Sequence, residues 1–401
     1  MAVVALGFSI LLTGCDAPIG RFSSNEVFAK RLELTDDIPL DEPLTDSSDL
    51  LTEWFGTPDD PRWPDFLRES NGESLVQMDR LVQAAGAFSS DEAGSHVGLY
   101  REHCVVCHGL TGDGLGPSAA LLNPYPRDYR MGKFKFTSTP IGVRPSRDDL
   151  LRTLKRGIVG TSMPAFNLLP EDELEALVDY VIYFSVRGEA ERRLLAEAAL
   201  ELDVEGGDRL WDSKLATRDP DAYAERQEEL VEVVGAIVEK WKVAPAKVSP
   251  IPEYPYGDSE ESELAESAAR GHELFSGTTA GCSFCHGSEG LGDGQQNNYD
   301  DWTRDWTSLA GINPKDEDAL KPMLDLGALK PRNILPRNLQ RGVFRGGSDP
   351  QDLYSRIMHG IEGTPMPAAP LKPANPQGLS ESEVWDLVNF LLSLSDGGSK
   401  S

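Results

Sequence analysis

The sequence predicts a mainly α-helical protein that contains two copies of one domain. Landmarks of the same kind recur in the same order in both halves of the chain. Between the copies, apolar residues recur at helical spacing, and no segment alternates with period two for long enough to indicate a sheet. A length of 401 residues is typical of two or three domains.

Composition and charge exclude several classes of protein. The chain carries 38 Lys and Arg against 66 Asp and Glu, a formal net charge of −28 at pH 7. Nucleic-acid backbones and anionic membrane surfaces repel a chain this acidic, so nucleic-acid binding is excluded. Five cysteines are also too few for a small disulfide-stapled scaffold.

Residues 1–14 form an apolar run that is too short to span a bilayer of roughly 30 Å and that suits a secretory signal. The run ends in Leu12-Thr13-Gly14-Cys15, which resembles the lipobox of bacterial lipoproteins. The resemblance implies cleavage before Cys15, a lipid on its sulfur and a location on the periplasmic side of a bacterial membrane. Cys15 is also the thiol left over from two CxxC pairs. The run lacks the Lys or Arg of such signals, and a plain signal peptide is the alternative.

Residues 15–90 are acidic and contain scattered prolines, together with Trp54, Phe55 and Trp63. We expect an irregular arm that reaches from the lipid anchor and lies against the globular part of the protein.

Residues 91–187 and 263–398 are the two copies of the predicted domain. Each copy has a CxxCH motif, a Gly/Asp loop, a Pro-Arg pair with a glycine after it, a Gly-Thr-X-Met-Pro-Ala loop and a final helix. Five landmarks in one order indicate a duplication. They lie at residues 104–109, 111–114, 126–132, 157–165 and 173–180, and again at 282–287, 290–294, 336–342, 360–368 and 383–390.

Local signals place the helices of each copy. Ser89 with Glu92 matches a capping box before the first CxxCH helix, and Ser380 with Glu383 matches one before the last helix. Pro170 is followed by acidic residues, which favour a helix start through the helix dipole.

Residues 188–262 separate the two copies as a helical spacer followed by a proline-rich linker. The spacer has an apolar stripe at helical spacing, which predicts either packing on a neighbouring domain or a helix that docks a partner. The stripe consists of Leu230, Val233, Val234, Ile237, Val238 and Trp241.

The CxxCH motifs indicate covalent haem attachment. Two cysteines three residues apart lie on one side of a helical turn, and the histidine follows on the same turn. Both sulfurs can then bond the vinyl groups of one haem while the imidazole reaches its iron. The sequence therefore predicts two covalently bound haem c groups, held by Cys104, Cys107 and His108 and by Cys282, Cys285 and His286.

Three alternatives compete with this interpretation. A structural zinc site would add His103 to the first motif, but the second copy has Gly281 at that position. A redox-active CxxC of the thioredoxin type would lie in a βαβ unit, and no such pattern surrounds either motif. Chance is the third alternative.

Each copy offers a methionine as the second axial ligand. Met163 and Met366 lie in the matching loops, where Pro and Gly fix the backbone so that the thioether points inward. Met131 aligns with Arg341, and Met323 and Met358 have no counterpart in the first copy, so we expect core or surface residues at these three positions. We expect solvated or locally hydrogen-bonded imidazoles at His96, His103, His272 and His359.

Each half resembles a class I cytochrome c domain, with an aromatic residue in its first helix (Tyr100, Phe275) and in its last helix (Tyr180, Phe390). The resemblance covers roughly residues 91–187 and 264–397. It implies c-type haems attached outside the cytoplasm with His and Met on the iron, and it makes Arg127 and Arg337 candidates to neutralise the haem propionates. The chain departs from the family in its spacer, its N-terminal arm and an insertion near residues 302–330.

Charge is unevenly distributed along the chain. Residues 121–160 have a net charge of +6, whereas residues 187–281 have a net charge of −11. Propionate neutralisation with solvated surface explains this pattern, and steering of two different partners by two faces is the alternative.

These observations predict a dihaem electron-transfer protein rather than an enzyme. Because methionine would fill both sixth positions, we expect no catalytic residues and no site for substrate at either iron. The expected partners are a quinol-oxidising complex or a haem-copper oxidase, reached as a tethered shuttle or as a fixed subunit. A dihaem peroxidase-like enzyme with one open iron is the alternative.

Overall fold

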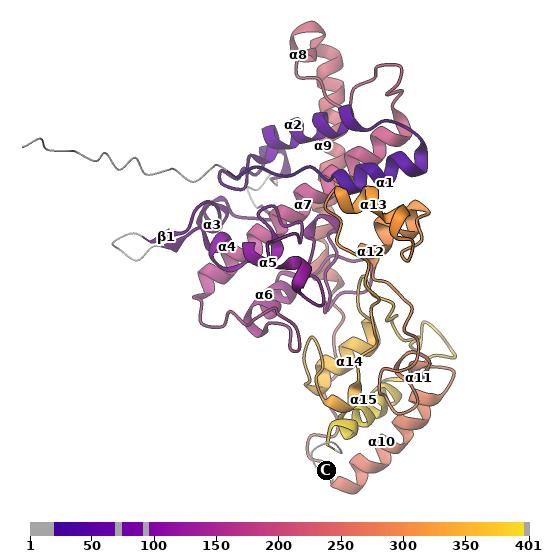
Figure 1. The fold of residues 1–401 in the computed structure, drawn as a ribbon. Helices are drawn as coiled ribbons and strands as arrows, with labels where there is room; N and C mark the ends of the chain where they lie inside the picture. The colour runs from indigo at the N-terminus through magenta and orange to yellow at the C-terminus, as the bar shows by residue number, and fades with distance from the viewer. Residues whose placement is uncertain (1–19, 69–73, 91–95, 397–401) are drawn as a thin grey trace, which may run out of the picture.

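The computed structural model describes residues 20–68, 74–90 and 96–396 (Figure 1). The predicted mainly helical fold is confirmed, and the signal segment with Cys15 lies outside the described residues.

The described strands are β1 (Ser89–Ser90) and β2 (His96–Val97), which pair antiparallel. The α-helices are α1 (Glu26–Asp36), α2 (Asp41–Phe55), α3 (Met78–Ala84), α4 (Leu99–His103), α5 (Val105–His108), α6 (Arg147–Arg156), α7 (Glu171–Glu201), α8 (Leu215–Arg218), α9 (Pro220–Lys242), α10 (Glu261–Ser276), α11 (Cys282–His286), α12 (Asp301–Trp306), α13 (Glu317–Asp325), α14 (Pro350–His359) and α15 (Glu381–Asp396). Short 3-10 helices are η1 (Asp65–Leu67), η2 (Ala119–Leu121), η3 (Tyr129–Met131), η4 (Ala244–Lys247), η5 (Ser308–Ala310) and η6 (Leu339–Arg341).

Helix α7 is the centre of the first domain. It packs against α1, α2, α3, α4, α6 and α9, so nearly every face of its middle section is buried. It begins after Pro170 with three acidic residues in its first turn, as predicted. It ends only at Glu201, so the predicted boundary at residue 187 falls inside one continuous helix.

The N-terminal arm differs from the expectation. Residues 20–90 are largely helical where the structure describes them, and Trp54, Phe55 and Trp63 belong to the core of the first domain. The Tyr183 hydroxyl of α7 donates to the Phe55 carbonyl at 2.6 Å. The arm lies against the globular part as expected, but its helices were not predicted, although Leu50, Leu51, Trp54 and Phe55 of α2 recur at helical spacing.

One of the two predicted capping boxes is present. Ser380 accepts from the Glu383 backbone N–H at 3.3 Å, and Glu383 accepts from the Ser380 N–H at 2.7 Å. The box predicted at Ser89 is wrong, because Ser89 lies in β1 and the first CxxCH helix begins after Gly98. Gly98 has φ +78°, and a Cβ there would lie 2.4 Å from the backbone of Phe88, so the chain turns at this position instead.

The spacer belongs to the first domain. Its apolar stripe packs into that domain's core, which agrees with packing on a neighbouring domain rather than with a free docking helix. Trp241 also donates through Nε1 to Glu189 of α7 at 3.1 Å. The linker then touches both domains, since the Ser249 N–H donates to the Ser138 carbonyl and the Tyr254 hydroxyl donates to Asn389.

The second domain is built on the packing of α10 against α15. The two helices approach closely at Gly271, where a Cβ would lie 2.0 Å from the Asp386 carbonyl oxygen. A separate hydrophobic core surrounds them, with Phe275, Leu353, Tyr354, Leu387 and Trp385 among its buried members.

The insertion of the second domain, near residues 302–330, packs against the first domain. Helices α12 and α13 lie beside α1, away from α10, α14 and α15 (Figure 1). Trp302 of α12 lies under the Arg127 guanidinium, 3.3 Å from its carbon to the ring centroid, and against Gly363 on the other side. Ion pairs join Lys133 to Asp301 and Arg192 to Asp305. The two domains are therefore packed together and not connected by the linker alone.

No helix of the described part of the chain combines the length and the apolar character that crossing a membrane requires.

Candidate haem sites

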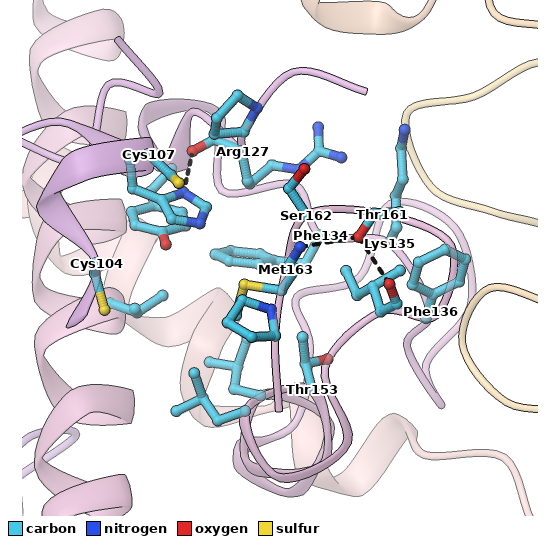
Figure 2. A pocket seen from close by; sticks show the side chains of 18 of the residues that line it. Cys104, Cys107, Arg127, Phe134, Lys135, Phe136, Thr153, Thr161, Ser162 and Met163 are labelled. Carbon is cyan, nitrogen blue, oxygen red and sulfur yellow. Dashed lines mark hydrogen bonds between the residues drawn. The ribbon is translucent and has the colours of Figure 1, made fainter. Parts of the chain in front are cut away.

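The first CxxCH motif opens onto a large cavity of the first domain. Cys104, Cys107, His108 and Met163 all line this cavity, which holds about 1310 Å³ of space including its open mouth. Figure 2 shows the cysteine sulfurs at one side and Met163 in the middle of the view. The structure thus brings together the four first-domain residues that the sequence predicts around one haem.

Each motif histidine is oriented by a backbone carbonyl. His108 Nδ1 donates to the Arg127 carbonyl at 3.1 Å, and His286 Nδ1 donates to the Arg337 carbonyl at the same distance. This bond leaves Nε2 with its lone pair free to bind a metal. Burial lowers the pKa of His108 to about 4 and lowers that of His286, so both rings are neutral at pH 7. Tyr129 stacks on the His108 ring with centroids 5.0 Å apart.

The two methionine loops share one set of hydrogen bonds. Thr161 accepts from the Met163 N–H at 3.1 Å, and Thr364 accepts from the Met366 N–H at 3.2 Å. Each threonine hydroxyl also donates to the carbonyl of an isoleucine three residues earlier. Gly157 precedes the first loop with φ +63°, and a Cβ there would lie 2.6 Å from the loop backbone.

The cysteines are not arranged as metal ligands. Burial raises the pKa of Cys104 to about 12 and that of Cys282 to about 11, so both stay protonated thiols before any covalent attachment. Within the described residues, no group of three His, Cys, Asp or Glu side chains lies close enough to hold a metal ion. This donor set argues against the zinc alternative, and the helical surroundings argue against a thioredoxin-type site.

The walls of the first cavity fit a haem. Apolar side chains from three segments enclose it, and they include Phe134, Leu150, Leu154, Val178 and Val181. Basic side chains line it as well, and among the described residues Arg127 and Lys135 have no carboxylate partner. A flat apolar group with carboxylates at one edge matches these walls.

Some residues of the first cavity were not predicted from the sequence. His103 lines it, and its buried Nε2 lies 3.8 Å from a carboxylate oxygen of Glu102 without a hydrogen-bond partner among the described residues, whereas a solvated or locally bonded ring was expected. Its position directly before Cys104 was the available signal. Lys135 and Arg345 also line the cavity, and Arg345 comes from the second domain, a contact that only the tertiary structure brings about.

The other side chains singled out in the sequence lie away from this cavity. His96 bonds Glu102 at 2.9 Å, His359 bonds Ser355 at 3.2 Å, and His272 stacks on Phe390. Among the methionines, Met323 is fully buried in the small core of the insertion, Met131 is half-buried in η3, and Met358 packs on the second core.

Comparisons with known proteins agree with these sites. Residues 92–181 match the family model of cytochrome c oxidase, cbb3-type, subunit III, and residues 268–395 match the cytochrome c model. No curated protein matches the chain. A chain of the Kuenenia stuttgartiensis reducing HAO-like protein complex Kustc0457/Kustc0458 has 23% identity and a TM-score of 0.45, over 74% of this chain and 94% of that one. The two family matches show that the protein contains two cytochrome c domains, the first of them similar to subunit III of cbb3-type cytochrome c oxidase.

Proposed function

We propose that the protein carries two haem c groups and passes single electrons between respiratory-chain partners at the outer face of a membrane. One observation carries this proposal. Both domains contain a histidine oriented by a backbone carbonyl and a methionine held in an identically bonded loop. Two sites of one design, in which histidine and methionine would take both axial positions, would suit electron transfer rather than binding of a substrate to iron.

The chain's own side chains would hold and insulate the haems. When bound, haem c supplies a one-electron iron couple. Cys104 with Cys107 and Cys282 with Cys285 would anchor the two rings, and the histidine and methionine of each domain would ligate iron. A soft thioether ligand favours the ferrous state and so raises the reduction potential. The apolar walls of the cavity exclude water, which keeps charge reorganisation small.

The state of the iron sites is tested by carbon monoxide. The purified protein should contain two covalent haems per chain, and after reduction it should not bind carbon monoxide rapidly at neutral pH. The variants Met163→Ala and Met366→Ala should each bind one equivalent. Rapid stoichiometric binding by the unaltered protein would contradict closed irons and would favour the peroxidase-like alternative.

We infer further that a lipid on Cys15 holds the protein at the membrane and that its partners are a quinol-oxidising complex or a haem-copper oxidase. The lipobox-like Leu12-Thr13-Gly14-Cys15 supports the anchor. The match of residues 92–181 to an oxidase subunit model supports an oxidase-type partner.

Extraction of native membranes in mild detergent tests this part of the proposal. Mass analysis of the haem-stained band should find a lipid on Cys15. Oxidase or quinol-oxidising subunits that stay bound at physiological salt would identify a fixed subunit, whereas a band that runs alone would identify a tethered shuttle. An unmodified Cys15 in the mature chain would contradict the anchor.

A further inference from the structure

Several basic side chains remain without carboxylate partners where the two domains meet, and four of them, Arg127, Lys135, Arg337 and Arg345, form one cluster. Within residues 121–160, every Lys and Arg except Arg127 and Lys135 forms an ion pair with a described Asp or Glu. In the second domain, Arg337 and Arg345 likewise form no ion pair with a described carboxylate, and the same is true of Arg332 and Arg356, which lie over Tyr125 and Phe136 of the first domain. Most of the positive charge of residues 121–160 is thus neutralised by pairing, and what remains is concentrated at the domain interface.

The four cations are close to one another. The Arg127 guanidinium and the Lys135 ammonium lie over the Trp302 ring at 3.3 and 5.7 Å. Arg345 donates to the Gly160 carbonyl of the first methionine loop at 3.4 Å, and a Cβ on Gly160 would lie 3.3 Å from Arg337. The cluster therefore spans the contact between the two domains.

Burial makes this arrangement unfavourable without an anion. Desolvation lowers the pKa of Arg127 to about 10 and that of Lys135 to about 7. The positive charges of Arg127 and Arg345 lower the Lys135 pKa further, and the negative charge of Asp300 offsets part of the shift at both Arg127 and Lys135. The Nε atoms of Arg337 and Arg345 are buried without a hydrogen-bond partner among the described residues. Unpaired buried cations are costly, so an anionic group at this place would stabilise the fold.

The nearby carboxylates have other partners. Asp128 binds Arg130, Asp301 binds Lys133, and Asp300 accepts from the Thr303 backbone N–H at 3.0 Å as the N-cap of α12. Asp149, which also lines the first cavity, is bonded to Arg152. None of these carboxylates makes an ion pair with the four cations of the cluster.

Three of the cations, Arg127, Lys135 and Arg345, line the first cavity together with Cys104. Figure 2 places Lys135 across the cavity from Cys104. Haem carries its two propionates on the edge away from the vinyl-derived bonds to cysteine. The side of the cavity that would receive these propionates is therefore the side where the cations gather, and one of those cations belongs to the other domain.

We propose that Arg345 of the second domain completes the haem site of the first domain, where it joins Arg127 and Lys135 in binding the propionates and raises the reduction potential of that haem. This inference rests on the proposed haem content of the first domain. A positive charge near the haem stabilises the electron added on reduction, so its removal should make the first haem harder to reduce. The second domain would thereby set the driving force of a haem that it does not ligate.

A redox titration of the full-length dihaem protein tests the proposal. Met163→His lowers the potential of one haem and so identifies the wave of the first haem. In Arg345→Gln we expect the midpoint potential of that wave to fall, because the equilibrium constant for reduction should be lower by about threefold to tenfold. A tenfold change corresponds to about 59 mV for one electron. The wave of the second haem should move less.

Two further variants separate the effect of Arg345 at the first cavity from the general effect of removing a positive charge from the second domain. Arg345→Lys keeps the charge and should restore most of the shift. Arg341→Gln removes an exposed charge from the same domain without lining the first cavity, and it should leave the first wave in place. An unmoved first wave in Arg345→Gln, or an equal shift in Arg341→Gln, overturns the inference, whereas a first domain without haem would overturn the proposed function.

The source of the anion is tested in the same titration. If the propionates bind the cluster, the midpoint potential of the first haem should be the same with and without inorganic phosphate at constant ionic strength. If the cluster binds a free anion, added phosphate should lower the first wave in the unaltered protein but not in Arg345→Gln. That outcome would overturn the assignment to propionates.

Discussion

Thr161 holds the methionine loop of the first domain with a single hydroxyl. The hydroxyl accepts from the Met163 N–H and donates to the Ile158 carbonyl at 2.8 Å, which closes the loop on itself. Thr364 makes the same two bonds around Met366. The hydroxyl of each threonine, together with the backbone bonds from Ile158 N–H to the Met163 carbonyl and from Ile361 N–H to the Met366 carbonyl, therefore fixes the position of each proposed thioether ligand.

Replacement of this hydroxyl should loosen one iron site and leave the other unchanged. In Thr161→Val, the Met163 N–H loses its partner and the Ile158 carbonyl keeps only its bond from the residue 161 backbone N–H, which costs roughly 1 kcal/mol. We expect carbon monoxide to bind the reduced first haem about fivefold faster than in the unaltered protein, as measured by stopped flow. Thr364→Val should have the same effect on the second haem only. Equal binding rates in the variant and the unaltered protein would show that the loop does not depend on this hydroxyl.

A buried ion pair ties the N-terminal segment to helix α7. Arg187 and Glu191 are 2% and 0% exposed and lie 2.8 Å apart, with the Asn25 N–H donating to Glu191 and Phe22 stacked under the Arg187 guanidinium. The ion pair therefore anchors the N-terminal segment to helix α7, although the two are far apart in the sequence. Its loss would leave one buried charge uncompensated.

Glu191→Ala should destabilise the protein by about 3–5 kcal/mol in urea unfolding. The matched control is Glu197→Ala, which breaks the Arg193–Glu197 pair on the same helix at the same spacing. That pair is largely exposed, and its loss should cost less than about 1 kcal/mol. Similar losses in both variants would contradict a structural role for the buried pair.

The capping box of helix α15 predicts a pH dependence. Hydrogen bonds from Ser380 hold the pKa of Glu383 below its usual value of 4.5, so the folded state favours the ionised carboxylate. The stabilisation is present above the ordinary value and is lost as the pH falls through the lowered folded value. Glu383→Gln should be less stable at pH 7 by under about 1 kcal/mol, and the deficit should shrink towards pH 3.

Thermal unfolding followed by circular dichroism at the two pH values measures this effect. Glu381→Gln is the control, because it removes a charge from the same turn without touching the capping bond. A deficit of Glu383→Gln that is the same at pH 3 and pH 7 would contradict the argument.

Sequence predicted the elements that depend on local patterns and missed those that depend on distant contacts. A few neighbouring residues encode the CxxCH turns, the methionine loops and the Ser380 cap, so residue spacing alone was sufficient to predict them. The helices of the N-terminal segment pack against α7, which is far away in the sequence, although α2 carries a helical signal of its own in Leu50, Leu51, Trp54 and Phe55. Arg345 could not be assigned to the first cavity, because only the domain interface brings it there.

At the scale of the whole molecule, Trp302 connects the two domains. Its indole donates to the Asp128 carbonyl at 3.2 Å and its ring lies between Arg127 and Gly363. Asp128 follows the residue whose carbonyl orients His108, and Gly363 lies within the Ile361–Thr364 turn of the second methionine loop. One side chain thus contacts the immediate surroundings of both proposed haem sites.

Trp302→Ala should separate the domains without unfolding either one. The ring contributes a cation–π contact of about 2 kcal/mol where it is shielded from water, together with its buried surface. Small-angle scattering should show a larger radius of gyration, and electron exchange between the haems should slow. Trp302→Phe keeps a ring at this position, so its radius of gyration and its exchange rate should lie between those of the unaltered protein and of Trp302→Ala. An unchanged scattering curve in Trp302→Ala would show that the ion pairs alone fix the interface.

The return of the insertion to the first domain has a kinetic consequence. Because α12 is fixed by Lys133 and Arg192 as well as by Trp302, the two domains need no hinge motion to come into contact. Carriers whose domains must swing are slowed when glycerol or sucrose thickens the solvent. In this protein, internal electron exchange should be insensitive to solvent viscosity, and only the encounters with its partners should slow as diffusion slows.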